Sequence, residues 1–128
     1  MISASYHNLG LLFLRLSLGA TMLLSHGVPK VSKYPGTSFP DPLGFGSEVS
    51  WALAVFSELI CSIFLILGLW TRLTLLPLLV TMLVAVFVVH GADPFSRKEL
   101  GLLYLFGYIS LFLSGPGKYS VDNKMRGY

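Results

Sequence analysis

Cysteine and charge are scarce in this chain of 128 residues, and each shortage excludes a class of protein. The single cysteine, Cys61, excludes an internal disulfide and a Cys-x-x-Cys redox centre. Charged residues make up 12% of the chain and hydrophobic residues 54%, whereas about a quarter of the residues of soluble globular proteins are charged. The basic residues are scattered rather than clustered, which argues against nucleic acid as a partner.

Recognisable cofactor motifs are also missing. The sequence has no glycine-rich phosphate loop, no haem or flavin motif and no Ser/His/Asp set. Its Glu and His residues are never three or four positions apart, which is the spacing of metal ligands in helix bundles. We therefore expect no metal, and the cofactor stays unknown, with a quinone as the open candidate.

The apolar residues form long blocks, which is the pattern of a membrane protein. Four blocks each approach the ~20 residues that cross a ~30 Å hydrocarbon layer, namely 9–28, 50–70, 73–90 and 99–114. They predict an all-α membrane protein, a four-transmembrane-helix bundle in a single domain, 1–128, with a longer loop between helices 1 and 2. Pro29 should end the first helix, and Gly115-Pro116-Gly117 the last.

The loop between the first two helices, 30–49, is rich in proline and glycine, which excludes a long helix there. Its apolar residues Phe39, Leu43 and Phe45 favour a lid packed on the mouth of the bundle. The turn at Thr71-Arg72 is tight, so the second and third helices should be antiparallel neighbours.

Two ionisable residues lie inside the apolar blocks, Arg15 in the first and Glu58 in the second. A charged side chain near the bilayer centre costs ~2.5–3.5 kcal/mol on insertion scales. Each should therefore face protein or water and have a partner. We predict that both face the bundle interior, where they could pair with each other. One interpretation is a functional site, and the other is an ion pair that only fixes the fold.

Four more ionisable residues should lie near the outer ends of the helices. His26 and His90 end the first and third helices, Glu99 opens the fourth, and Lys30 follows His26 by one turn. With Arg15 at the bottom and Glu58 above it, they predict a polar column that widens outward, although each could instead be an ordinary interfacial residue. The candidate residues for ligand binding or proton relay are therefore Arg15, His26, Lys30, Glu58, His90 and Glu99. Catalytic residues stay unknown.

An even number of helices places both termini on one side of the membrane. The two sides carry equal numbers of Lys and Arg, so the terminal amine and the basic tail decide the orientation. We expect both termini in the cytoplasm.

An ordered set of short motifs resembles the DoxX family of small four-helix bacterial membrane proteins. The motifs are Arg15-Leu16-x-Leu18-Gly19, His26-Gly27-x-x-Lys30, Glu58, Leu67-Gly68-Leu69-x-Thr71-Arg72, Ala85, His90, Glu99 and Gly115-Pro116-Gly117-x-x-Ser120-x-Asp122. The resemblance implies a multi-pass protein of the bacterial inner (plasma) membrane. It also implies a link to thiosulfate:quinone oxidoreductase and to thiol-redox membrane complexes, without an established catalytic residue to carry over.

Two hypotheses of function follow. In the first, the chain is a redox-associated, quinone-linked membrane subunit, whose outward-opening pocket binds a quinone or a small anionic ligand and which works with a soluble redox partner. Whether it is itself an enzyme stays open. In the second, it is a non-enzymatic membrane scaffold, whose segment 115–122 and basic tail recruit a soluble partner. Membrane lipid surrounds the chain in both, and a homo-oligomer is compatible with both.

Overall fold

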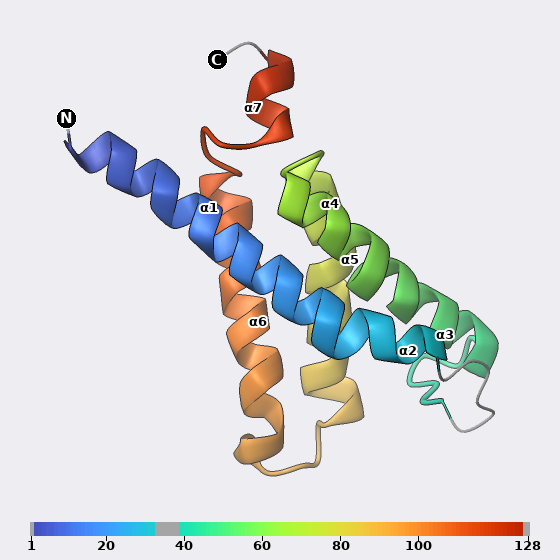
Figure 1. Ribbon diagram of the computed structural model, residues 1–128. Coiled ribbons are helices and arrows are strands. Elements are labelled where there is room, and N and C mark those ends of the chain that lie inside the picture. The colour runs from blue at the N-terminus through green and yellow to red at the C-terminus, as the bar shows by residue number, and fades with distance from the viewer. Residues whose placement is uncertain (1, 33–38, 127–128) are drawn as a thin grey trace.

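The computed structural model describes residues 2–32 and 39–126, and every regular element in these ranges is a helix (Figure 1). Three of the long helices contain a π-helical turn, labelled η. The elements in chain order are α1 (Ile2–Met22), η1 (Leu23–Gly27), α2 (Val28–Ser32), α3 (Ser47–Val55), η2 (Phe56–Cys61), α4 (Ser62–Leu67), α5 (Thr71–Val84), η3 (Ala85–Val89), α6 (Phe95–Ser114) and α7 (Val121–Arg126).

Three helices in the described part of the chain are long and apolar enough to cross a membrane, Ser5–Ser32, Ser47–Leu67 and Thr71–Val89. The helix α6, which covers the predicted fourth block, is 20 residues long but carries Arg97, Lys98 and Glu99 near its start. A charged first turn suits the membrane surface better than the hydrocarbon layer. The count of four membrane-spanning helices therefore stays a prediction.

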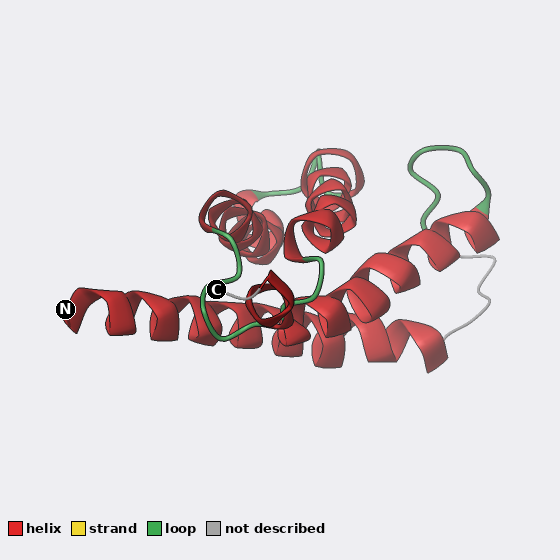
Figure 2. Cartoon of the chain, turned by 90° about the horizontal axis from the view of Figure 1, so that it is seen from above, coloured by secondary structure: helices red, strands yellow, loops and turns green. Residues whose placement is uncertain are grey.

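The helices pack as a bundle with an apolar exterior. The first helix lies against α4 and α6, and α5 lies against α6 and η2 (Figures 1 and 2). Fully buried core residues include Leu65, Leu75, Leu78, Tyr108 and Leu111. Many large apolar side chains point outward instead, Phe13 and Leu113 with three quarters of their surface exposed. Such an exterior suits contact with lipid rather than with water.

The first helix is longer at both ends than the predicted range 9–28. It begins at Ile2, because the polar residues before the apolar block also adopt helical geometry. It continues past Pro29 to Ser32. A proline inside an α-helix clashes with the carbonyl four residues earlier, but here it follows a π-helical turn, in which Val28 N–H donates to Leu23 O. The π-type hydrogen bonding before Pro29 allows the helix to continue, so Lys30 belongs to the first helix.

The described part of the connecting loop, residues 39–46, is fastened to the start of α3. Asp41 accepts hydrogen bonds from the Ser50 hydroxyl at 2.8 Å and from Gly46 N–H at 2.9 Å. These hydrogen bonds hold the pKa of Asp41 below its ordinary value, and the bond from Ser50 contributes most. The predicted loop is shortened by helix at both ends, and its Pro35-Gly36 dipeptide lies outside the described residues.

Candidate functional site

The three π-helical turns lie toward the same end of the bundle, and each brings an ionisable residue there. His26 lies in η1, Glu58 in η2, and His90 directly follows η3. Turns η1 and η2 pack against each other at Gly27, where an added Cβ would lie 2.7 Å from the backbone oxygen of Glu58. Single π turns inside α-helices occur frequently at functional sites. Glycine is needed here because no side chain fits between the two backbones.

Glu58 pairs with Lys30 across these packed turns. The distance from Lys30 Nζ to Glu58 Oε1 is 2.6 Å, and the two side chains are 26% and 6% exposed. Trp51 Nε1 donates to the backbone oxygen of Lys30 at 2.8 Å and so fixes the end of the first helix against α3. Because the carboxylate is nearly buried, removal of the ammonium would leave a charge without compensation, a change that is strongly destabilising in proteins.

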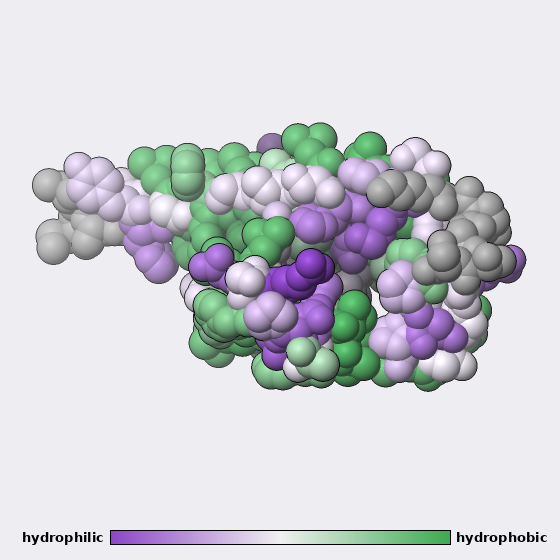
Figure 3. Space-filling model, turned by 90° about the horizontal axis from the view of Figure 1, so that it is seen from below, coloured by the Kyte–Doolittle hydropathy of each residue, from purple (hydrophilic) through white to green (hydrophobic). Residues whose placement is uncertain are grey.

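On one side of the ion pair lies a polar cavity of about 210 Å³. Its polar lining comes from His26, Lys30, Glu58, His90, Arg97, Lys98 and Tyr104. His26 meets the ring of Tyr104 edge-on at 5.7 Å between centroids, and His90 Nδ1 lies 2.8 Å from Asp93 Oδ2. Figure 3 views this end of the bundle and shows hydrophilic residues gathered within an apolar surround. The cavity therefore connects the ion pair with a hydrophilic surface.

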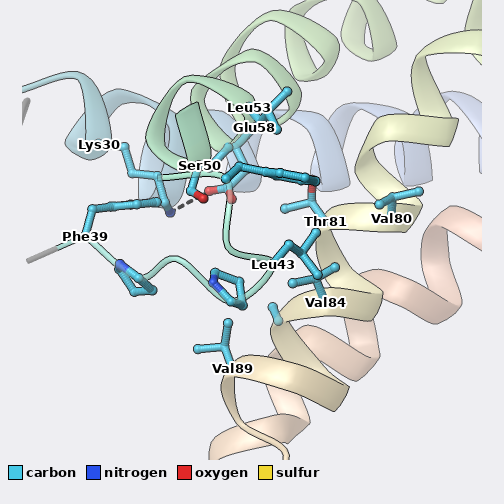
Figure 4. A pocket seen from close by; sticks show the side chains of 15 residues that line it. Lys30, Phe39, Leu43, Ser50, Leu53, Glu58, Val80, Thr81, Val84 and Val89 are labelled. Carbon is cyan, nitrogen blue, oxygen red and sulfur yellow. Dashed lines mark hydrogen bonds and ion pairs between the residues drawn. The ribbon is translucent and has the colours of Figure 1, made fainter. Parts of the chain in front are cut away.

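On the other side lies an apolar cavity of about 420 Å³. Loop residues such as Phe39 and Leu43 form one wall, and Val80, Val84 and Val89 of α5 and η3 form the opposite one (Figure 4). Lys30, Glu58 and Ala85 line both cavities. The ion pair thus stands between an apolar chamber and a polar one.

Arg15 belongs to a different centre, so the predicted pairing of Arg15 with Glu58 is wrong. Its guanidinium donates to Pro116 O and to Tyr119 O, both at 2.7 Å, and the residue is 1% exposed. The reason is that the segment after α6 folds back over the bundle end (Figures 1 and 2). Arg15 lies near that end, and the backbone carbonyls of Pro116 and Tyr119 take the place of a carboxylate partner.

The same returning segment caps the next helix through Asp122. Its carboxylate accepts from Trp70 N at 2.7 Å, from Thr71 N at 2.8 Å and from the Thr71 hydroxyl at 2.8 Å, while Asp122 N donates to Gly68 O at 2.9 Å. An acid at the start of a helix satisfies free N–H groups and favours the helix dipole. We call the segment 115–122, which includes Asp122, the clasp segment, and this segment together with Arg15 and Gly68 the clasp. In the sequence, Asp122 is distinguished only as part of a family motif.

Of the six predicted site residues, the structure brings four together around the two cavities: His26, Lys30, Glu58 and His90. Glu99 is exposed, and its neighbours Arg97 and Lys98 line the polar cavity in its place. The sequence alone could not show which of the three consecutive charged residues near the start of α6 faces the cavity, because they occupy neighbouring positions. Tyr104, which was not among the predicted site residues, also lines this cavity.

Comparison with known proteins agrees with these motifs. Residues 10–91 match the DoxX family. An uncharacterised protein of Haemophilus influenzae is 35% identical over 121 residues, which cover 89% of each chain. A second protein of that organism is 30% identical over 69% of this chain and 62% of its own length, and an uncharacterised membrane protein of Mycobacterium tuberculosis is 29% identical over 88% and 78%. No solved structure matches. The match over most of the chain shows that the protein belongs to the DoxX family of membrane proteins.

Proposed function

We propose that this chain is a redox-associated membrane subunit that binds a lipid-soluble quinone beside the Lys30–Glu58 pair. The observation that carries the proposal is the apolar cavity that ends at a buried ion pair. Its volume of about 420 Å³ lies within the roughly 300–1,000 Å³ that is typical of ligand pockets. A quinone needs these two surroundings together, an apolar chamber for the ring and tail and a polar contact for a carbonyl oxygen.

The ion pair supplies the groups that quinone chemistry requires. The Lys30 ammonium donates a hydrogen bond to one quinone carbonyl, and Glu58 transfers one proton to that oxygen as the quinone is reduced. Reduction to the quinol takes up an electron pair, which a soluble redox partner supplies, and a pair of protons, which enter through the polar cavity beside His26 and His90. An imidazole ring has two nitrogens that can accept and donate protons, so these two side chains can relay protons to Glu58.

The proposed location is the bacterial plasma membrane, with both termini in the cytoplasm. In that orientation the polar cavity faces the outer side of the membrane, and protons reach Glu58 from there. The basic residues Lys118 and Lys124 then lie on the cytoplasmic side, as the distribution of Lys and Arg in membrane proteins favours.

The test is substitution of Glu58 by Gln in the chain held in native-lipid discs, with a short-chain quinone as the probe. We expect quinone affinity to fall roughly 10- to 100-fold, because Glu58 holds the Lys30 ammonium that donates to the quinone carbonyl, and a hydrogen bond to a charged group contributes about 1.5–3 kcal/mol. Glu48→Gln is the matched control, since Glu48 lies exposed on the same helix. Equal affinities in a folded Glu58→Gln variant and in the wild type would eliminate the proposal.

The alternative function is a scaffold that recruits a soluble partner through the segment 115–122. What favours it is that Arg15 and Asp122 hold the backbone of this segment in a defined conformation, with Lys118 and Lys124 exposed. A chain truncated after Ser114 separates the two functions. A scaffold loses its partner in a pull-down when the chain is truncated and keeps it in the Glu58→Gln variant. A quinone-binding subunit loses quinone affinity in the Glu58→Gln variant.

A further inference from the structure

A second polar hollow, of about 300 Å³, lies at the opposite end of the bundle from Glu58. It lies between the start of α1, the start of α5 and the clasp segment, and its polar lining includes His7, Asn8, Arg72, Lys118 and Asp122. We propose that this hollow binds the headgroup phosphate of an anionic phospholipid. This inference is independent of the quinone site.

The charge available in the hollow is positive. Its single acid, Asp122, already accepts three hydrogen bonds from Trp70 and Thr71. Its two permanent cations, Arg72 and Lys118, are both exposed. A phosphate entering the hollow therefore meets two cations and a carboxylate whose acceptor capacity is largely taken up.

The Arg72 guanidinium and the backbone of Lys118 are each held by hydrogen bonds. The Arg72 guanidinium donates through Nε to Phe112 O at 2.8 Å and through Nη2 to Leu113 O at 3.4 Å, which leaves the N–H groups of Nη1 and the second one of Nη2 for an anion. Lys118 is fixed through its backbone, since its N–H donates to Asn8 Oδ1 at 3.0 Å. Its side chain is therefore not what attaches the segment to the bundle.

The surroundings favour a lipid headgroup as the source of the phosphate. The hollow lies where α6 ends at Ser114 and α5 begins at Thr71, and the ends of membrane helices lie near the headgroups. Tyr6 and Tyr119 are exposed at this end, as is typical of the aromatic belt at a membrane interface. Exposed Leu113 continues along the helix surface, where acyl chains would lie.

The bound headgroup would connect two parts of the chain. Arg72 belongs to α5 and Lys118 to the clasp segment, so one phosphate between them holds the segment against the bundle. Anionic lipid should therefore stabilise the docked segment, and zwitterionic lipid should not.

The experiment measures binding of dioleoyl phosphatidylglycerol to the full chain in detergent by native mass spectrometry, with dioleoyl phosphatidylcholine as reference. We expect Lys118→Gln to bind the anionic lipid about fivefold more weakly, since a basic residue near an anionic lipid surface contributes about 1 kcal/mol. Lys118→Arg should retain the affinity. Lys124→Gln is the matched control, because Lys124 is exposed on the same side but does not line the hollow.

Unchanged affinity in Lys118→Gln, or an equal loss in Lys124→Gln, would overturn the proposal. So would equal binding of the two lipids by the wild type. A parallel arm with inorganic phosphate identifies the source: competition at concentrations similar to those of the lipid would show a site for a free anion and overturn the assignment to lipid. Quinone affinity should be the same in all these variants, so this test fails or succeeds separately from that of Glu58.

Discussion

Arg15 and Glu58 are both buried, yet the first is enclosed by backbone and the second stands beside two cavities. Arg15 donates to two carbonyl oxygens of the clasp segment, which lies more than 100 residues away in the chain. Glu58 has the partly buried ammonium of Lys30 as partner, with a cavity on each side of the pair. Removal of the charge at Arg15 should therefore affect mainly stability, and removal at Glu58 mainly ligand binding.

The largest expected effect is that of Arg15→Leu. It leaves the partly buried carbonyls of Pro116 and Tyr119 without their donor, and an unsatisfied buried group costs about 1–3 kcal/mol. We expect the free energy of unfolding in detergent to fall by about 2–5 kcal/mol, with a smaller loss in Glu58→Gln, which keeps the shape of the side chain. Arg97→Gln, at an exposed site, should stay near the wild type. A larger loss in Glu58→Gln than in Arg15→Leu would reverse the comparison.

A second effect on stability, no larger than that of Arg15→Leu, is expected at Gly68, where the clasp segment meets the bundle. Gly68 has φ +73°, and an added Cβ would lie 2.5 Å from Ser120 Cβ. Gly44 has a similar φ of +77° with open space around it, so Gly44→Ala carries only the backbone cost of about 1–2 kcal/mol. Gly68→Ala should destabilise by about 1–3 kcal/mol more, as measured by thermal unfolding. Equal losses at the two positions would mean that the segment does not pack there.

The smallest effect concerns pH at the loop beside the apolar cavity. Because the folded pKa of Asp41 is lowered, the contribution of its hydrogen bonds to stability is fully present above the ordinary value of 3.8 and is lost as the pH falls through the lower folded value. The Gly46 amide resonance, whose N–H donates to Asp41, should report that titration by NMR. In Ser50→Ala the midpoint should rise toward 3.8. An unchanged midpoint would show that the Ser50 hydroxyl is not the main cause, and Asp41→Asn should abolish the titration.

Much of the polar site near Glu58 could be predicted from the sequence, because its residues lie at helix ends that the apolar blocks define. His26, Lys30 and His90 were each expected near one end of the bundle, with Glu58 deeper in the second helix, and all four line one cavity. The continuation of the helix through Pro29 was not predictable, since a π-helical turn has no known signature in these residues. Position along a helix also could not fix the depth of Arg15, because depth depends on where the neighbouring helices end.

The order of apolar blocks by itself determined that this chain is helical and built for a membrane, since a hydrocarbon layer tolerates only long apolar segments whose backbone is internally hydrogen-bonded. The tertiary structure alone decided which charges share a site. Because the C-terminal segment folds back, Arg15 donates hydrogen bonds to backbone carbonyls. Because the first two helices approach closely at Gly27, Glu58 lies within reach of Lys30 and pairs with it. Such partnerships depend on distances across the bundle, and a linear pattern of residues contains no measure of them.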